Sequence, residues 1–376
     1  MVTIMAGAAV APALGKIAEF FPEESLTTIK LILTLPAVFM VIFSLVSGRL
    51  TARFSKRKVL CLGLLIYLAS GIGGGFANSI EMLLLSRALL GIGVGLIMPL
   101  STGLITDFFE GEERVKTMGY STASSNLGGI ITTLASGALA VYSWRFSFGV
   151  YSLGFVALFL VLAYLPEQDN QNRGKTDAQK LPITVYAWAG AMFLFMLTFY
   201  SIPVNVAIFL KENQLGDASS AGLVISLSTA GGFVGGITFA HAQRITKNLF
   251  PVLLVGFMST GYLILSHANS LPLLLLSTAI IGLGLGWTMP VLFVGATKAG
   301  GEGMGVQTMA VVSSLAYLGQ FLSPIILDAV GQILGNTSTR FIFLVIGICY
   351  GILVLFMLLS LFRMRWRSSA VPVKTN

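Results

Sequence analysis

The chain has 376 residues, of which 55% are hydrophobic and 10% are charged, and its formal net charge is +8 at pH 7. A soluble domain carries about a quarter charged residues, so this composition excludes a water-soluble globular protein and indicates an integral membrane protein. Both cysteines, Cys61 and Cys349, lie in apolar segments, and no disulfide framework is expected.

Segments long enough to cross a membrane follow one another along the whole chain. A spanning helix needs about 20 mostly apolar residues, and the sequence contains eleven such segments. In the first half they lie near 29–50, 58–77, 80–106, 115–141 and 145–165. In the second half they lie near 183–210, 218–240, 249–267, 271–297, 304–330 and 339–362. A twelfth, Met1–Leu14, is apolar but too short to cross about 30 Å of hydrocarbon.

The two halves repeat each other at an offset of 191 residues. The segment Ser79–Pro99 recurs as Ser270–Pro290, and Pro12 corresponds to Pro203. Repeats of this length in an apolar chain indicate two similar bundles with the substrate held between them. We therefore predict an all-α membrane protein of two six-helix bundles. The expected boundaries are an N-terminal bundle at 1–165, a linker at 166–182, a C-terminal bundle at 183–362 and a basic tail at 363–376.

The repeat also predicts that the first helix is shorter than its counterpart in the second half. Only 11 residues precede Pro12, against some 20 apolar residues before Pro203. The first helix is therefore expected to lack about nine residues, or roughly 13 Å of its length. One hypothesis is that translation begins upstream of Met1; the alternative is a short first helix that thins the bilayer.

Lysine and arginine are distributed unevenly between the two sets of loops. Seventeen fall on one side, and five fall on the other: Lys16, Lys30, Arg145, Lys211 and Arg340. Under the positive-inside rule, the linker and both termini are expected in the cytoplasm, with the chain in the plasma (inner) membrane. The basic charge is then an orientation signal, and no nucleic-acid partner is expected.

A short motif after the second span points to a family. The segment from Gly48 to Leu60 reads Gly-Arg-Leu-Thr-Ala-Arg-Phe-Ser-Lys-Arg-Lys-Val-Leu. It resembles the loop between helices 2 and 3 of the major facilitator superfamily, with Ala52 in place of an aspartate. The resemblance implies a cytoplasmic gate that includes Gly48, Arg53 and Arg57. Asp107 is the acid that could take the place of the missing aspartate; alternatively, the cations only set orientation.

Further motifs agree with this resemblance and narrow it. Arg87-Ala-Leu-Leu-Gly-Ile-Gly matches a family pattern in helix 4. Part of the helix-5 antiporter motif survives, and the Gly-Pro bend is missing. Its remaining residues are Gly119, Gly128 and Gly137. Together with Ala-Pro-Ala at 11–13 and Trp-Arg-Phe at 144–146, these residues resemble the drug–proton antiporter branch.

Arg87 stands out because the repeat carries Thr278 at the equivalent position. An arginine inside a membrane span is costly and is by default a functional candidate. The alternative is that its long side chain extends to the outer membrane interface.

Faces rich in polar residues occur in two spans. Near 304–330, residues three and four apart place five on one face: Ser313, Tyr317, Gln320, Pro324 and Asp328. Near 115–141 a similar face carries Thr122, Asn126, Gly129, Thr133 and Ser136. Such faces line a cavity or join helices by hydrogen bonds. The family resemblance implies that helices 1, 4, 7 and 10 line the path. The candidate path residues are Arg87, Asn126, Tyr200, Asn205, Trp287, Tyr317 and Gln320.

Several kinds of chemistry find no support in the sequence. No Asp or Glu lies in the middle of a span, and His241 and His267 are isolated. The glycine-rich stretches lie within spans and lack the Lys-Ser/Thr of a nucleotide loop. We therefore expect no enzyme activity, no cofactor and no metal site.

The sequence thus predicts a secondary transporter that works as a monomer by alternating access. Its leading function is proton-coupled efflux of small amphiphilic compounds. The alternative is a carrier for a small organic anion, with Arg87 as the anion contact. A third hypothesis is a membrane receptor or scaffold that transports nothing.

Overall fold

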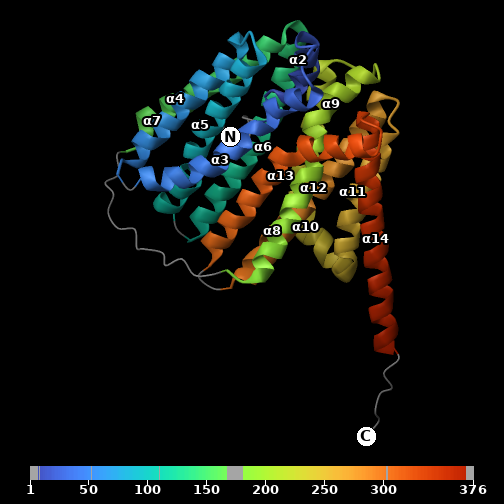
Figure 1. Ribbon diagram of the computed structural model, residues 1–376. Coiled ribbons are helices and arrows are strands. Elements are labelled where there is room, and N and C mark those ends of the chain that lie inside the picture. Colours follow the sequence, from blue (N-terminus) through green and yellow to red (C-terminus); the bar gives the residue numbers. More distant parts are fainter. Residues whose placement is uncertain are drawn as a thin grey trace.

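The computed structural model describes residue 7 and residues 9–51, 53–109, 111–166, 181–301 and 304–369. Within these ranges only the backbone is described at residues 102, 106, 107, 111, 112, 114–116, 118, 119, 122, 123, 248, 305, 306 and 362–369. Throughout the described part the regular elements are helices (Figure 1). The expected linker and basic tail fall largely outside it.

In the described part of the first half there are nine helical elements. They are η1 (Ala11–Ala13), α2 (Leu14–Phe20), α3 (Leu26–Leu50), α4 (Lys56–Gly73), η2 (Gly74–Phe76), α5 (Ile80–Phe108), α6 (Gly111–Tyr142), η3 (Trp144–Leu153) and α7 (Gly154–Tyr164). The second half contains α8 (Ile183–Phe199), α9 (Ser201–Glu212), α10 (Ala218–Thr246), η4 (Lys247–Leu249), α11 (Phe250–Ser266), α12 (Leu271–Gly300), α13 (Gly305–Ile333) and α14 (Thr339–Ser369).

Most of the expected spans are long, apolar helices. Within the described residues, nine segments are long and apolar enough to cross a membrane. The eleven expected spans correspond to these nine together with α6 and the shorter α11. Polar side chains start several of these helices: Ser25, Ser55, Ser79 and Asp217 each accept a hydrogen bond from a backbone N–H three residues later.

The expected span at 183–210 is interrupted between α8 and α9 at Tyr200. Pro203 explains the interruption, because proline has no N–H and its ring crowds the carbonyl four residues earlier, that of Phe199. Tyr200, at this interruption, lines the two cavities of the next section.

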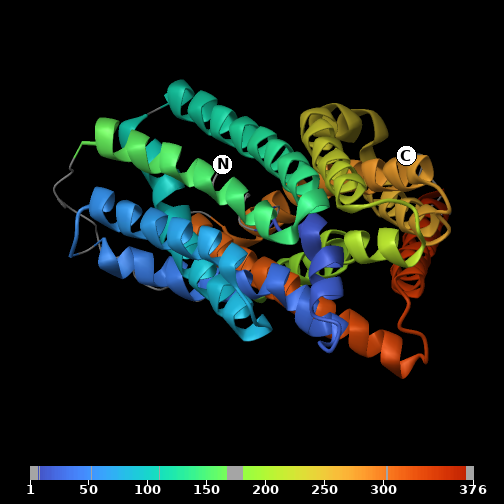
Figure 2. The ribbon, with the colours of Figure 1, turned by 90° about the horizontal axis from the view of Figure 1, so that it is seen from above.

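The internal repeat is visible in the element boundaries. Helices α5 and α12 begin at Ile80 and Leu271, and α6 and α13 end at Tyr142 and Ile333. Each pair differs by 191 residues. In Figure 2 most helices of the first half gather on one side and most of the second half on the other.

A half-buried arginine also clamps a loop in each half. Arg145 Nη1 donates to the carbonyl of Ala77 at 2.6 Å, and its Nη2 donates to Asn78 Oδ1 at 3.1 Å. In the second half Arg340 Nη2 donates to the carbonyl of Ala268 at 2.8 Å and to Asn269 Oδ1 at 2.9 Å. These acceptors are 191 residues apart, so both halves use one arginine to hold the same loop.

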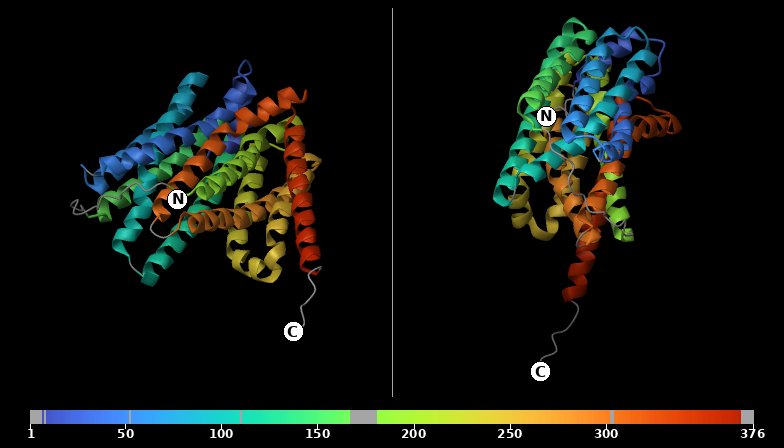
Figure 3. Two further views of the ribbon diagram at one scale, coloured as in Figure 1. Left: turned by 60° about the horizontal axis from the view of Figure 1, so that its bottom comes forward. Right: turned by 90° about the vertical axis from the view of Figure 1, so that its left-hand side faces the viewer.

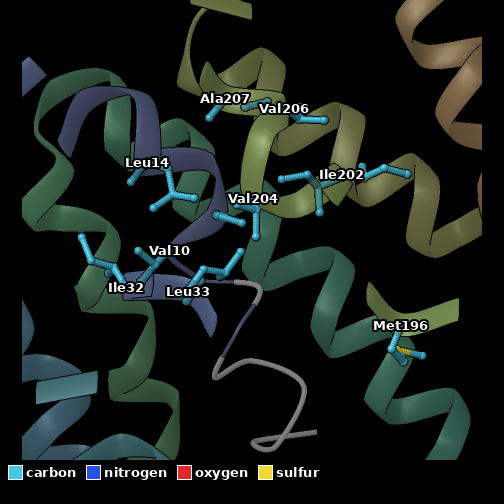
Figure 4. Close-up of a cluster of buried hydrophobic side chains, with 14 of the residues drawn as sticks. Val10, Leu14, Ile32, Leu33, Met196, Ile202, Val204, Val206 and Ala207 are labelled. Atoms are coloured by element: carbon cyan, nitrogen blue, oxygen red, sulfur yellow. The ribbon is translucent and has the colours of Figure 1, made fainter. Parts of the chain in front are cut away.

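The short helices η1 and α2 lie at one end of the molecule, which we call the α2 end (Figures 1 and 3). The described C-terminal end of α14 extends in the opposite direction (Figure 3). At the α2 end, η1 and α2 pack against α9, their counterpart in the repeat. Figure 4 shows Val10 and Leu14 facing Val204 and Ala207 of α9, with Leu33 of α3 beside them.

The two halves meet along two pairs of long helices, which we call the seams. One seam joins α3 to α13, and the other joins α6 to α10. The repeat relates α3 to α10 and α6 to α13, so the seams are equivalent in position. They are built differently, as shown below.

Candidate functional site

Two adjoining cavities lie between the halves. The larger has a volume of about 630 Å³ and the smaller about 380 Å³. Gly7, Leu33, Tyr200 and Met289 line both, so the cavities share a wall. Leu33 belongs to the first half, whereas Tyr200 and Met289 belong to the second. A molecule held here would contact both bundles, as a carrier with alternating access requires.

The lining is apolar and adaptable. Four methionines face the smaller cavity: Met40, Met98, Met196 and Met289. The larger cavity is bounded by Phe199, Phe233, Pro203 and Pro290. Among the described residues that line either cavity, none is charged. Methionine side chains adapt to different shapes, and such surfaces suit several apolar ligands.

Four of the seven candidate path residues line these cavities. Asn126 lies on the larger cavity, Tyr317 and Gln320 lie on the smaller one, and Tyr200 faces both. Ser313 joins the smaller cavity, so three members of the predicted polar face of α13 point inward. The Tyr317 hydroxyl lies 2.8 Å from Met98 Sδ of α5 and so links the two halves across the cavity.

Asn205 and Trp287 lie outside both cavity linings. Asn205 is 1% exposed, and its amide donates to the carbonyl of Ser201 at 2.9 Å. The Trp287 indole donates to Thr238 Oγ1 at 3.1 Å and packs on Phe257. The family resemblance implied that both residues line the path. In the structure, each instead points into its own bundle.

Arg87 also lies away from the cavities, inside the first bundle. Its side chain is 0% exposed. Its guanidinium carbon lies 4.7 Å from the centre of the Phe148 ring and 5.2 Å from that of Tyr151, and Nη1 donates to the Tyr151 hydroxyl at 2.8 Å. Aromatic faces of η3 thus surround the cation. This placement differs from both expectations, since Arg87 neither faces the cavity nor extends to the membrane interface.

The expected cytoplasmic gate is only partly described. Gly48 lies in α3, and Arg53 is exposed in the turn that follows. Arg57 Nη2 donates to the carbonyl of Leu162 in α7 at 2.6 Å. Asp107 and Gly119 lie in helices, but their side-chain surroundings fall outside the described part. The gate therefore stays a prediction.

The helix-5 motif residues lie in α6, where Gly128 and Gly137 are buried. A Cβ atom on Gly137 would lie 2.8 Å from the carbonyl oxygen of Ala218 in α10. A Cβ atom on Gly222 of α10 would lie 2.8 Å from the carbonyl of Thr133. Backbone meets backbone at this seam, which only glycine permits.

An ion pair between the halves escaped the sequence analysis. Lys30 of α3 donates from Nζ to Asp328 Oδ1 of α13 at 2.6 Å. Thr27 Oγ1 donates to Asp328 Oδ2 at 2.8 Å. The charge count places Lys30 in a loop, and the spacing near 304–330 places Asp328 on the polar face of that span. Opposite charges at the same depth of two spans can indicate an ion pair, but the sequence does not show that α3 lies beside α13.

Comparison with known proteins agrees with this architecture. A family model described as Major Facilitator Superfamily matches residues 1–324. Multidrug resistance protein 1 of Bacillus subtilis is 27% identical over 307 residues, which cover 77% of each chain. The quinolone resistance protein NorA of Staphylococcus aureus is 23% identical over 306 residues, 78% of each chain. The cephamycin export protein CmcT of Amycolatopsis lactamdurans is 28% identical over 329 residues, 76% of this chain and 64% of that protein.

Solved structures share the fold. A bacterial homologue of the human lysosomal transporter Spinster, in an inward-facing and occupied conformation, aligns with a TM-score of 0.75 at 15% identity, covering 96% of this chain and 94% of that one. The human organic anion transporter MFSD10 aligns with a TM-score of 0.65 at 15% identity, covering 94% and 96%. Because the family model spans most of the sequence and the repeat, seams and cavity fit it, the chain belongs to the Major Facilitator Superfamily.

Proposed function

We propose that this protein exports small amphiphilic compounds by alternating access of a cavity between its two bundles. The observation that carries the proposal is the pair of adjoining cavities, lined from both halves by methionine and aromatic side chains and by no described charged residue. An apolar compound with one or two polar groups fits such a lining, since Asn126, Gln320 and the hydroxyls of Tyr200 and Tyr317 supply a few hydrogen bonds.

The relatives support export over uptake. The names of three similar proteins refer to multidrug resistance, quinolone resistance and cephamycin export. We infer the same direction for this chain, with the proton gradient as the energy source and the plasma membrane as the location. Both termini are proposed to lie in the cytoplasm.

A carrier for organic anions remains the second proposal, but its main residue is badly placed for it. Arg87 is fully buried against Phe148 and Tyr151 and lines neither cavity. A carboxylate in either cavity would meet hydroxyl and amide groups, which stabilise an anion less than a guanidinium does.

Transport in a bacterial strain that lacks its own multidrug exporters tests the proposal. Cells that express the protein should accumulate several-fold less ethidium than cells with an empty vector, and a protonophore should remove the difference. Benzoate accumulation should be unchanged. Reduced benzoate with unchanged ethidium would support the anion carrier, and no flux of any compound would support the receptor or scaffold hypothesis.

Variants of one residue connect the flux to the cavity. Tyr200 lines both cavities. Tyr200→Ala removes the aromatic side chain from their shared wall and should raise the half-saturating ethidium concentration by about tenfold, which corresponds to about 1.4 kcal/mol. Tyr200→Phe keeps the ring and should change this value by less than about threefold. Equal flux in all three proteins would place the binding site elsewhere.

A further inference from the structure

The described part of the chain buries three charged side chains: Lys30, Arg87 and Asp328. Arg87 is held within one bundle, whereas Lys30 and Asp328 join the two. The side chain of Lys30 is 3% exposed and that of Asp328 is 12% exposed. Their contact of 2.6 Å lies at the α2 end of the seam between α3 and α13, with Thr27 as a second donor to the carboxylate.

The equivalent place in the other seam has no charge. The repeat relates Lys30 to Ala221 of α10 and Asp328 to Gly137 of α6, each at the offset of 191 residues. Ala221 is fully buried, and Gly137 meets the backbone of α10 directly. At this end, one seam is therefore closed by direct backbone packing, and the other is closed by an ion pair between a lysine and an aspartate.

These two closures respond differently when the helices separate. Separating α6 from α10 would break close backbone contacts, and the described residues at this end of the seam form no ion pair whose hydration could compensate. Parting α3 from α13 would expose Lys30 and Asp328 to water, which solvates both charges and offsets their lost attraction. A buried ion pair adds little net stability compared with apolar packing, but it specifies one arrangement and can be broken.

We propose that Lys30 and Asp328 form a latch that closes the outer side of the cavity. It rests on the proposed function, because only an alternating-access carrier needs an outer closure that opens. When the latch parts, α3 and α13 separate at the α2 end while the glycine contacts between α6 and α10 hold. Leu33, one turn from Lys30 and lining both cavities, then becomes accessible from outside.

Cysteine labelling measures this opening without reference to transport. The starting protein carries Cys61→Ser and Cys349→Ser, and Leu33→Cys is the reporter. Leu33 is 3% exposed, so a membrane-impermeant maleimide added to intact cells should label it slowly. Asp328→Asn keeps the size of the side chain and its contact with Thr27 but removes the charge. It should raise the labelling rate about tenfold, which corresponds to about 1.4 kcal/mol in the closed–open equilibrium.

Two further variants test whether the pair itself is responsible. Lys30→Gln should accelerate labelling as Asp328→Asn does. The exchange of both charges, Lys30→Asp with Asp328→Lys, should restore most of the slow rate. If the exchanged variant is labelled as fast as the single variants, the attraction between the two residues does not close the cavity. If the single variants are labelled at the rate of the starting protein, the latch is overturned.

A second ion pair provides a matched control. Lys211 of α9 lies 3.2 Å from Glu19 of α2 and also joins the halves at the α2 end, but both side chains are nearly half exposed. Exposed pairs contribute little, so Lys211→Gln should leave the Leu33→Cys rate within about twofold. If ethidium export fails while these rates change as expected, the proposed cargo is wrong and the latch stands.

Discussion

Arg87 occupies space that the first bundle provides and the second does not. A Cβ atom on Gly74 would lie 2.8 Å from Arg87 Nη2, and one on Gly71 would lie 2.7 Å from Tyr151 Cγ. At the equivalent positions the second half carries Leu265 and Tyr262. There Thr278 replaces the arginine. The first half thus has two glycines where the second has Leu265 and Tyr262, and it has a large cation where the second has a threonine.

This environment changes what Arg87→Ala should do. Removing a fully buried side chain that stacks on two rings leaves a cavity and removes the hydrogen bond from Arg87 to the Tyr151 hydroxyl. The variant should lose roughly 2 kcal/mol or more of folding stability, seen as a lower melting temperature of the purified protein in detergent. Thr278→Ala is the control, because its hydroxyl donates to the carbonyls of Leu274 and Leu275 in its own helix.

The same variant separates a packing role from a transport role. Arg87→Ala with a normal melting temperature but no flux would favour the anion-contact reading of the sequence. The melting temperature of Arg87→Lys should lie between those of the parent and Arg87→Ala, since lysine keeps the charge but loses the planar stacking on Phe148 and Tyr151.

Sequence reasoning isolated Arg87 because Thr278 breaks an otherwise duplicated segment. It did not reveal which way the side chain points, since that depends on how η3 packs against α4 and α6. The directions of the Asn205 and Trp287 side chains likewise could not be predicted from the sequence. In contrast, spacing along α13 predicted that Tyr317 and Gln320 share one helix face, and both line the smaller cavity.

At the scale of helices, the seam between α6 and α10 should be intolerant of added volume. Gly137→Ala places a methyl group 2.8 Å from the Ala218 carbonyl oxygen and 3.0 Å from Gly222 Cα, so the helices must move apart. We expect a loss of about 1–3 kcal/mol and a lower melting temperature. Gly190→Ala in α8 is the matched control, because its added Cβ would meet nothing within 4 Å. Equal melting temperatures for the two variants would contradict direct backbone packing at this seam.

The start of α10 depends on a single cap. The backbone N–H of Ser220 donates to Asp217 Oδ1 at 3.0 Å, and this bond holds the pKa of the Asp217 carboxyl below its usual value. Asp217→Ala should cost about 1 kcal/mol, whereas Asp217→Asn should cost much less because asparagine also caps. Thermal melting at pH 7 checks both.

The lowered pKa also gives the sign of a pH effect. The folded state binds the Asp217 proton less tightly than the unfolded state, so its contribution is present above the ordinary pKa of 3.8. It is lost as the pH falls through the lower folded value. The difference in melting temperature between the parent and Asp217→Asn should therefore shrink in acid. A difference that grows would show that the carboxylate destabilises the cap.

Helix positions were largely predictable, and helix partners were not. Apolar length and turn residues located the eleven spans within a few residues, but the span at 183–210 was predicted as one helix, and its break at Tyr200 was not. The seam partners α3 and α13 are almost 300 residues apart in sequence, so no local pattern paired Lys30 with Asp328. That contact, and with it the latch, came only from the fold.

For the whole molecule, orientation decides which side the latch closes. The connections of the described helices lie alternately at the α2 end and at the opposite end, so one reporter at each end reads the topology. Seventeen basic residues against five predict that the α2 end faces outward. Glu23, between α2 and α3, and His241, near the end of α10, are both exposed and lie at opposite ends.

In the cysteine-free background, Glu23→Cys should react with an impermeant maleimide in intact cells, and His241→Cys should react only after the membrane is opened. Equal total labelling in opened cells serves as the control for expression. Labelling of His241→Cys alone in intact cells would invert the topology. Lys30 and Asp328 would then close the cytoplasmic side, and the glycine seam would still hold while that side opened.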